Sequence, residues 1–280
     1  MTSWCETAYA KINLALHVRA RRSDGYHDIE TIFAFVDTGD ALTAAPSAGD
    51  SLAITGDFAE GLSADGENLV LRALGFMRSQ PGGTAIPPMA VTLDKKLPVA
   101  AGLGGGSADA AALIRLVQRE FGVGELEALV AASQSLGADV GACIISETRR
   151  GSGTGWELER VEDSDVRGLP LLLVNPRIPL ATGPVFAGWD GRDRGALAGG
   201  SALVSARSGR NDLEPPALAL VPEIDEVLAV LRAQLPIMAR MSGSGASCFA
   251  LFRSVAERDA AASRIANDHP DWWVMAGAVR

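Results

Sequence analysis

The segment LPVAAGLGGGSADAAAL at residues 97–113 limits most strongly what this chain can fold into. Four glycines fall within five residues, and a run of strong helix formers follows directly. Glycine adopts positive φ readily and lets a large anion approach without meeting a Cβ. A helix N-terminus offers free amide groups and about +0.5 of an elementary charge. The segment therefore predicts a phosphate-binding loop that opens a helix.

Two common phosphate loops do not match this segment. A Walker loop ends in Gly-Lys-Ser/Thr, whereas Ser107 and Ala108 follow Gly106 here. The dinucleotide-binding pattern needs a glycine where Ser107 stands, and it normally lies in the first βα unit. The remaining alternative is a plain flexible loop with Ser107 as helix cap, but capping does not require four glycines.

The apolar pattern along the chain predicts an α+β protein, and 48% hydrophobic residues suffice for a sizeable core. Residues 149–168 are rich in Gly, Ser and charge, so we expect two domains, 1–155 and 156–280. The predicted strands are 10–18, 29–36, 89–97, 169–176, a strand at Ile237, 248–252 and 272–279. The predicted helices are 67–77, 107–121, 124–136, 221–235 and 255–266.

Charge and composition exclude several function classes. The net charge is −9 with no stripe of Lys and Arg, so a nucleic-acid partner is not expected. Three scattered cysteines form no CxxC pair, and no metal-ligand set can be found. No signal peptide or membrane span is recognised, which favours a cytoplasmic protein without membrane attachment. No patch indicates a protein partner.

The glycine segment and a second one, MSGSGAS at residues 241–247, together resemble the two glycine motifs of the GHMP kinases. This resemblance implies an ATP-dependent small-molecule kinase with two domains. The N-terminal domain would resemble ribosomal protein S5 domain 2, and the C-terminal domain would be a ferredoxin-like α/β sandwich. The ATP-binding residues it implies are Pro98, Val99, Ala100, Ala101, Gly102, Leu103, Gly104, Gly105, Gly106, Ser107 and Ala108.

The N-terminal segment AKINLALHVRARRSDGYHDIETIFAFVDTGDAL narrows the resemblance to one branch of that family. Further matches are ENLVLRAL, LGADVG, NDLEP and MSGSGASCFALF. That branch uses ATP to phosphorylate the 2-hydroxyl of 4-diphosphocytidyl-2-C-methyl-D-erythritol in non-mevalonate isoprenoid biosynthesis. Another GHMP kinase, such as a homoserine or phosphomevalonate kinase, is the alternative. A silent nucleotide-binding regulator and a dinucleotide-dependent oxidoreductase are more distant ones.

The resemblance also implies which residues carry out phosphoryl transfer. Asp139 would be the general base, and Lys11 would keep its carboxylate ionised and stabilise the transferring phosphoryl group. The alternative roles are a helix cap for Asp139 and a solvated edge-strand position for Lys11. Mg²⁺ is expected to accompany ATP, and Ser107 either reaches that ion or a phosphate oxygen, or is only a helix cap.

The substrate end is assigned in the same way. The resemblance implies that Tyr26 stacks on the cytosine, that His27 hydrogen-bonds its polar edge and that Phe186 covers its other face. The substrate-binding residues it implies are Asn13, Tyr26, His27, Phe186, Gly243 and Ser244. The alternatives are a hairpin-turn Tyr-His pair, a core Phe186 and a strand-pairing Asn13.

Three residues depart from the family pattern. Tyr9 and Gly141 stand where the family usually has proline, and Trp156 stands where it usually has glutamate. None of the three removes a catalytic group. Without a proline at position 141, the backbone around Asp139 needs another constraint to be rigid. With tryptophan at position 156, the local geometry of the predicted domain junction can differ from that of the family.

Overall fold

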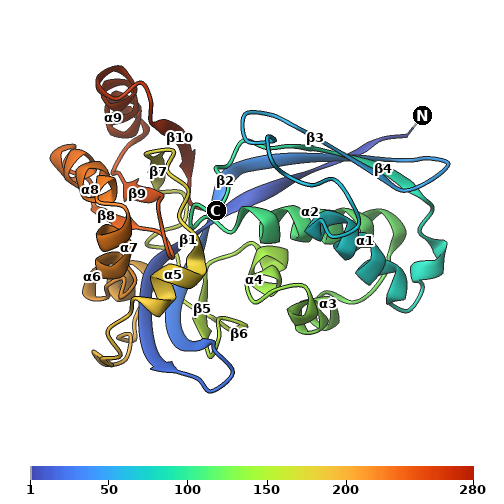
Figure 1. Cartoon of the computed structure of the whole chain (residues 1–280), viewed down its shortest axis with the longest axis horizontal. Helices are drawn as coiled ribbons and strands as arrows, with labels where there is room; N and C mark the ends of the chain where they lie inside the picture. Colours follow the sequence, from blue (N-terminus) through green and yellow to red (C-terminus); the bar gives the residue numbers. More distant parts are fainter. Residues whose placement is uncertain (1) are drawn as a thin grey trace. The chain divides into compact units, whose positions relative to one another are not determined.

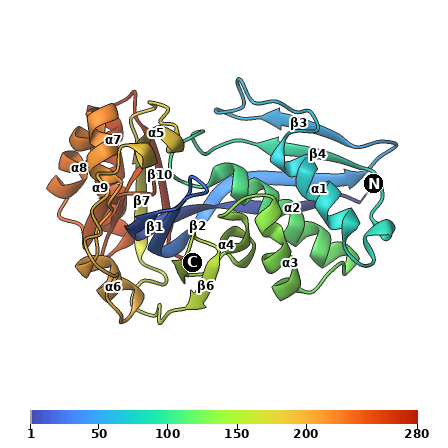
Figure 2. The same ribbon diagram turned by 60° about the horizontal axis from the view of Figure 1, so that its bottom comes forward.

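The computed structural model describes residues 2–280 and shows an α+β chain (Figures 1 and 2). These residues form two compact units. The first consists of the residues up to Ala10, Thr38–Val99 and Gly104–Ser146. The second consists of Lys11–Asp37, Ala100–Leu103 and Glu147–Arg280. The two long N-terminal strands contribute residues to both units, so neither unit is one continuous stretch of chain.

The strands are β1 Trp4–Arg21, β2 His27–Pro46, β3 Ser51–Thr55, β4 Met89–Asp94, β5 Arg149–Ser152, β6 Glu157–Arg160, β7 Pro170–Asn175, β8 Met238–Met241, β9 Cys248–Leu251 and β10 Trp273–Ala278. The helices are α1 Leu69–Ser79, α2 Gly105–Phe121, α3 Leu126–Ala132, α4 Val140–Ile145, α5 Thr182–Ala187, α6 Ala202–Ser208, α7 Glu214–Leu220, α8 Glu223–Ala233 and α9 Val255–Asp268. Two short 3₁₀ helices, η1 and η2, span Gly83–Ala85 and Ser133–Ser135.

Helix α2 is the central helix of the first unit. Helices α1 and α4 both pack against it, and its residues from Ala108 to Ile114 are all buried. The strand order of the first sheet is β3-β4-β2-β5-β6, and β1 pairs with β2. Strands β3 and β4 run parallel, while β2 is antiparallel to β4 and β5. The strand β4 ends just before the glycine segment, which leads into α2.

The second unit contains the expected antiparallel sandwich. Its sheet has the order β10-β7-β9-β8, with every neighbouring pair antiparallel. Helix α8 precedes β8 and α9 precedes β10, which gives the β-α-β-β-α-β succession of a ferredoxin-like fold. Both helices pack on the sheet (Figure 1), and the predicted stripe of Ile224, Val227, Leu228 and Leu231 is fully buried.

The predicted elements are recovered with shifted ends. Helix α2 begins at Gly105, two residues before the predicted start, because the last glycines of the loop already have helical geometry. Residues 176–220, in which we predicted no helix, contain the short helices α5, α6 and α7. The predicted domain boundary between residues 155 and 156 stays a prediction. Within residues 2–280 no helix is long and apolar enough to cross a membrane.

Two glycines of the first unit give opposite expectations for substitution. A Cβ at Gly39 in β2 would overlap the carbonyl oxygen of Ala8 in β1, whereas a Cβ at Gly75 in α1 would meet nothing. We expect Gly39→Ala to lower the free energy of unfolding by about 3 kcal/mol or more through overpacking. Gly75→Ala should raise it by about 1 kcal/mol through helix propensity. Urea titrations of both variants measure this, and equal midpoints would contradict it.

Candidate active site

The glycine segment reaches the helix in the geometry that anion binding requires. Gly104 is the N-cap of α2 with φ of 64°, and no side chain caps the helix. The first helical hydrogen bond runs from the Ala108 amide to the Gly104 carbonyl, at 2.8 Å. Ser107 lies in the first turn, so the alternative that it is the cap is wrong. Its hydroxyl forms no hydrogen bond with any residue between 2 and 280.

The middle of the glycine segment is fixed by the second glycine segment. Gly102 has φ of +74°, and a Cβ there would overlap the Ser242 carbonyl oxygen. The Ser242 hydroxyl donates to the Gly102 carbonyl at 2.8 Å, and the Ser247 amide donates to the Ala101 carbonyl at 3.1 Å. Only a residue without a side chain fits this contact. The predicted residues Gly243 and Ser244 belong to the same turn, and Ser244 is hydrogen-bonded to Thr182.

Lys11 lies in a buried polar row on β1 and β2. Its side chain is 5% exposed, which excludes a solvated edge-strand lysine. Its Nζ donates to Asn13 Oδ1 at 3.1 Å, and Asn13 Nδ2 donates to Thr31 Oγ1 at 2.8 Å. Its backbone amide donates to the Leu103 carbonyl, immediately before the N-cap of α2. Asn13 is thus bound through its side chain to Lys11, and its role in substrate binding stays a prediction.

Asp139 precedes α4, but its side chain does not cap that helix. Asp139 thus occupies the N-cap position, but the alternative that its side chain caps the helix is wrong, and the residue is half-buried. Gly141 has a packing reason: a Cβ there would lie 3.3 Å from the Val130 carbonyl oxygen. The absence of a side chain lets α4 approach α3, and this contact orders the backbone after Asp139. The third departure, Trp156, lies half exposed in the turn between β5 and β6.

The segment NDLEP has a structural role that the sequence did not reveal. Asn211 Nδ2 donates to the carbonyls of Met241 and Gly243, at 2.9 and 2.8 Å. Asp212 accepts a hydrogen bond from the Val18 amide at 2.9 Å. These two side chains connect β1 and the second glycine segment to the start of α7. The signal available in the sequence was an Asn-Asp pair before a proline, which indicates a turn but not its distant partners.

His27 and Phe186 lie in contact, and Tyr26 precedes His27 in the hairpin, whereas the contacts of all three with cytosine stay predictions. The His27 and Phe186 ring centroids are 5.0 Å apart, and Trp189, which the sequence analysis did not single out, lies 5.8 Å from His27. Tyr26 is 62% exposed and available to a ligand. Burial and the Arg21 guanidinium lower the pKa of His27. Arg21 Nε lies 3.4 Å from His27 Nε2 in donor geometry, which leaves the proton of the neutral ring on Nδ1.

A buried ion cluster supports the glycine segment from the first unit. Lys95 Nζ donates to Asp40 and, at 2.8 Å, to Asp109 in α2. The other oxygen of Asp40 accepts from the amides of Lys96 and Leu97, at 2.6 and 2.8 Å. The cluster thus ties the beginning of the loop to the helix that follows it. Burial, together with the Asp40 carboxylate, raises the pKa of Asp109 to about 7 against the opposing effect of Lys95.

The raised pKa of Asp109 makes stability depend on pH. Because the folded state keeps this proton up to about pH 7 and the unfolded state loses it near pH 4, the contribution of Asp109 falls as pH rises between these values. Asp109→Asn imitates the protonated form. We expect the free energy of unfolding of the variant, minus that of the parent, to be larger at pH 8 than at pH 5. Denaturant titrations at both pH values measure this, with exposed Asp259→Asn as control, and parallel pH profiles would contradict it.

Comparison with known proteins places these features in one family. Residues 68–147 match the family model "GHMP kinases N terminal domain", and residues 195–272 match "GHMP kinases C terminal". A 4-diphosphocytidyl-2-C-methyl-D-erythritol kinase of Sphingopyxis alaskensis is 57% identical over 98% of both chains. Its counterpart in Novosphingobium aromaticivorans is 55% identical over 98% of this chain and 92% of its own.

Solved structures agree with this assignment. The crystal structure of a 4-(cytidine 5'-diphospho)-2C-methyl-D-erythritol kinase has a TM-score of 0.77 at 29% identity, covering 99% of both chains. A homoserine kinase from Cytophaga hutchinsonii shares the fold, with a TM-score of 0.67 at 16% identity over 100% of this chain and 95% of its own. The chain is a small-molecule kinase that uses ATP, and it belongs to the 4-diphosphocytidyl-2-C-methyl-D-erythritol kinase branch of the GHMP kinase family.

Proposed function

We propose that the protein transfers the γ-phosphoryl group of ATP to the 2-hydroxyl of 4-diphosphocytidyl-2-C-methyl-D-erythritol, giving the 2-phosphate and ADP in isoprenoid precursor synthesis. The observation that carries this proposal is identity of 57% along 98% of the chain to a relative named for that substrate. The geometry of the two glycine segments supports it. So does that of the His27 cluster, which consists of Tyr26, His27, Phe186 and Trp189. A cytoplasmic location stays a prediction.

The glycine loop would hold the triphosphate through backbone groups. The uncapped first turn of α2 presents amides of Gly105, Gly106 and Ser107 at the positive end of a helix of 17 residues. A Cβ at Gly106 would meet nothing, so space is open on that side of the turn. Mg²⁺ prefers phosphate and water oxygens with one or two protein ligands. The Ser107 hydroxyl is the protein oxygen in this turn that fits that ion.

Asp139 and Lys11 would carry the chemical step. Asp139 would accept the proton of the substrate hydroxyl as that oxygen attacks the γ-phosphorus, and the bond to the β-phosphate oxygen breaks. Lys11 would stabilise the charge on the transferring group. Its hydrogen bond to Asn13 fixes the ammonium on a rigid strand pair, so it needs little reorganisation during the reaction. ADP leaves with the electron pair of the broken bond.

The His27 cluster would recognise the cytosine. A neutral His27 with its proton on Nδ1 can donate to a ring acceptor of the base, while the exposed Tyr26 ring offers a stacking surface. Phe186 lies against His27 and would close the other side. Trp189 packs edge-on to His27 and holds that ring in place.

The general base is tested by Asp139→Asn. We expect kcat to fall by roughly 10²- to 10⁴-fold, because the amide cannot accept the proton. The KM values of both substrates should change by less than threefold. Release of ADP from Mg-ATP, with and without the cytidine substrate, measures this, and Asp259→Asn serves as a charge-matched control.

The same assay separates the alternatives. Turnover with homoserine or a phosphomevalonate-type alcohol, but not with the cytidine substrate, would replace the proposed substrate and keep the kinase. ATP binding without turnover of any alcohol would overturn the proposed reaction. Full activity in Asp139→Asn would leave the reaction in place but remove Asp139 as its base.

The cytosine contact is tested by Tyr26→Ala. Stacking of one base on an aromatic ring contributes about 1–3 kcal/mol, so the KM of the cytidine substrate should rise roughly 5- to 150-fold. The KM of ATP and the melting temperature should not change, because the Tyr26 ring is exposed. Trp272→Ala, which removes a partly exposed aromatic ring stacked on His269, is the control. An equal rise in both variants would show that the effect is not specific to the hairpin.

A further inference from the structure

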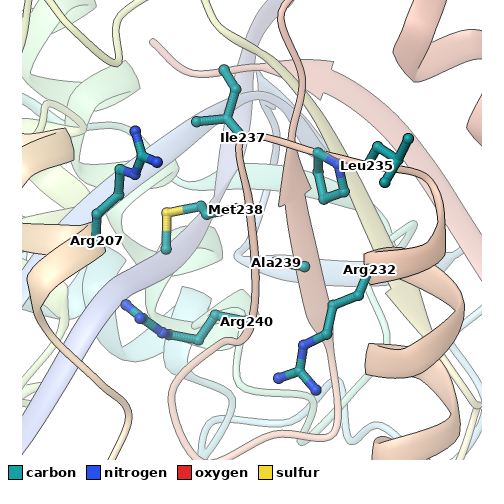
Figure 3. Close-up of a pocket in the computed structure, with 8 residues that line it drawn as sticks. Arg207, Arg232, Leu235, Ile237, Met238, Ala239 and Arg240 are labelled. Atoms are coloured by element: carbon teal, nitrogen blue, oxygen red, sulfur yellow. The ribbon is translucent and has the colours of Figure 1, made fainter.

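We infer that the second unit carries an additional ligand site, a pocket at strand β8 that binds a small organic anion with a short apolar part. The pocket has a volume of about 390 Å³ (Figure 3), and all of its lining residues belong to the second unit. They are Arg207, Arg232, Leu235, Pro236, Ile237, Met238, Ala239 and Arg240. This site does not depend on the proposed reaction, and none of these residues takes part in it.

The position of the pocket follows from the sheet order. Strand β8 is the last strand in the order β10-β7-β9-β8, so its outer edge has no neighbouring strand within the described chain. Helix α6 carries Arg207, and α8 carries Arg232. Figure 3 shows Arg207, Met238 and Arg240 on one side of the strand, and Arg232 and Ala239 on the other. The first group places two guanidinium groups beside an apolar side chain.

The charges in the pocket are only partly neutralised within residues 2–280, where Glu214 is the acidic side chain that acts on them. Arg240 donates only to backbone carbonyls, those of Leu14, Ala206 and Gly209. Burial lowers the pKa of Arg240; the Glu214 carboxylate opposes this shift, and the like charge of Arg232 adds to it to a smaller degree. Arg207 forms no hydrogen bond or ion pair with any residue between 2 and 280, and Arg232 reaches Glu214 only at 3.7 Å. Three cations gather here although the chain has a net charge of −9.

These features define the class of ligand. A guanidinium group binds phosphate and carboxylate oxygens through paired hydrogen bonds, and the exposed Arg207 is open to such a ligand. The volume lies in the range of small-molecule pockets, about 300–1,000 Å³. The anionic group would lie between Arg207 and Arg240, and its apolar part would contact Met238 and Ile237. An added peptide strand fits less well, because the four residues of β8 offer a short edge.

The test uses the full-length protein and calorimetric titration at low ionic strength. A saturating non-hydrolysable ATP analogue is present throughout to occupy the nucleotide site. The probes are inorganic phosphate, hexyl phosphate, hexanoate and hexanol. We expect hexyl phosphate or hexanoate to bind at one site per chain, at least fivefold more tightly than inorganic phosphate, and hexanol not to bind. Which of the two binds more tightly distinguishes a phosphate from a carboxylate ligand.

Two variants make the site falsifiable. Arg207→Gln removes a cation that forms no hydrogen bond or ion pair with the described residues. It should weaken binding at least tenfold. Arg167→Gln, an exposed arginine of the same unit, is the matched control and should have no effect. Met238→Glu supplies a carboxylate in place of the ligand. It should abolish binding and raise the melting temperature, with more effect at low salt than at high salt.

Several outcomes would overturn the inference. They are no binding of either amphiphilic anion, equal loss of binding in Arg207→Gln and Arg167→Gln, or a lower melting temperature for Met238→Glu at every salt concentration. Binding of an acidic peptide of alternating glutamate and threonine, without binding of hexyl phosphate or hexanoate, would replace the small-anion site with a peptide site. Kinase activity should be unchanged in Arg207→Gln, which separates this site from the catalytic one.

Discussion

The close contact between the backbones of Gly102 and Ser242 is the constraint on which the rest of the candidate site depends. It joins two glycine segments that lie about 140 residues apart, and it leaves no space for a Cβ at Gly102. Because of this contact, residues 100–103 pack with the second unit, although the residues on both sides of them belong to the first. The same four residues also receive the hydrogen bond from the Lys11 amide. One short segment thus orders the glycine loop before α2, the second glycine turn and the strand that carries Lys11.

Buried charge is stabilised in two different ways in this molecule. Lys95 has two carboxylate partners, and burial, together with the Asp40 carboxylate, raises the pKa of Asp109. Within the described residues no carboxylate is hydrogen-bonded to Arg240, which donates instead to three carbonyl oxygens. In the first arrangement the charges are balanced largely by other side chains of the protein, and the cluster connects the beginning of the glycine loop to α2. The second leaves a positive potential at the surface of a pocket, and an anion from solution can neutralise it.

The sequence predicted most of the fold because its signals were local. The helix at 221–235 was recognised from its apolar stripe, and the loop before α2 from its glycines. The role of Asn211 and Asp212 was missed because their partners, Gly243 and Val18, are distant in sequence and no local pattern encodes them. Ser107 was wrongly allowed as a helix cap because the helix starts inside the glycine run. Trp189 was missed because a lone tryptophan has no periodic signal.

The division of β1 and β2 between the two units also affects how the protein is made. The Arg280 amide bonds to the Phe35 carbonyl, and Val36 pairs with Val279. The hairpin emerges early from the ribosome, but its last partners are about 240 residues away in the chain. At a translation rate of roughly 5–20 residues per second, these partners are synthesised about 12 to 50 seconds after the hairpin. During this interval Phe35 and Val36 lack the backbone partners that the last residues of the chain supply, so this part of the hairpin reaches its final pairing only after synthesis is complete.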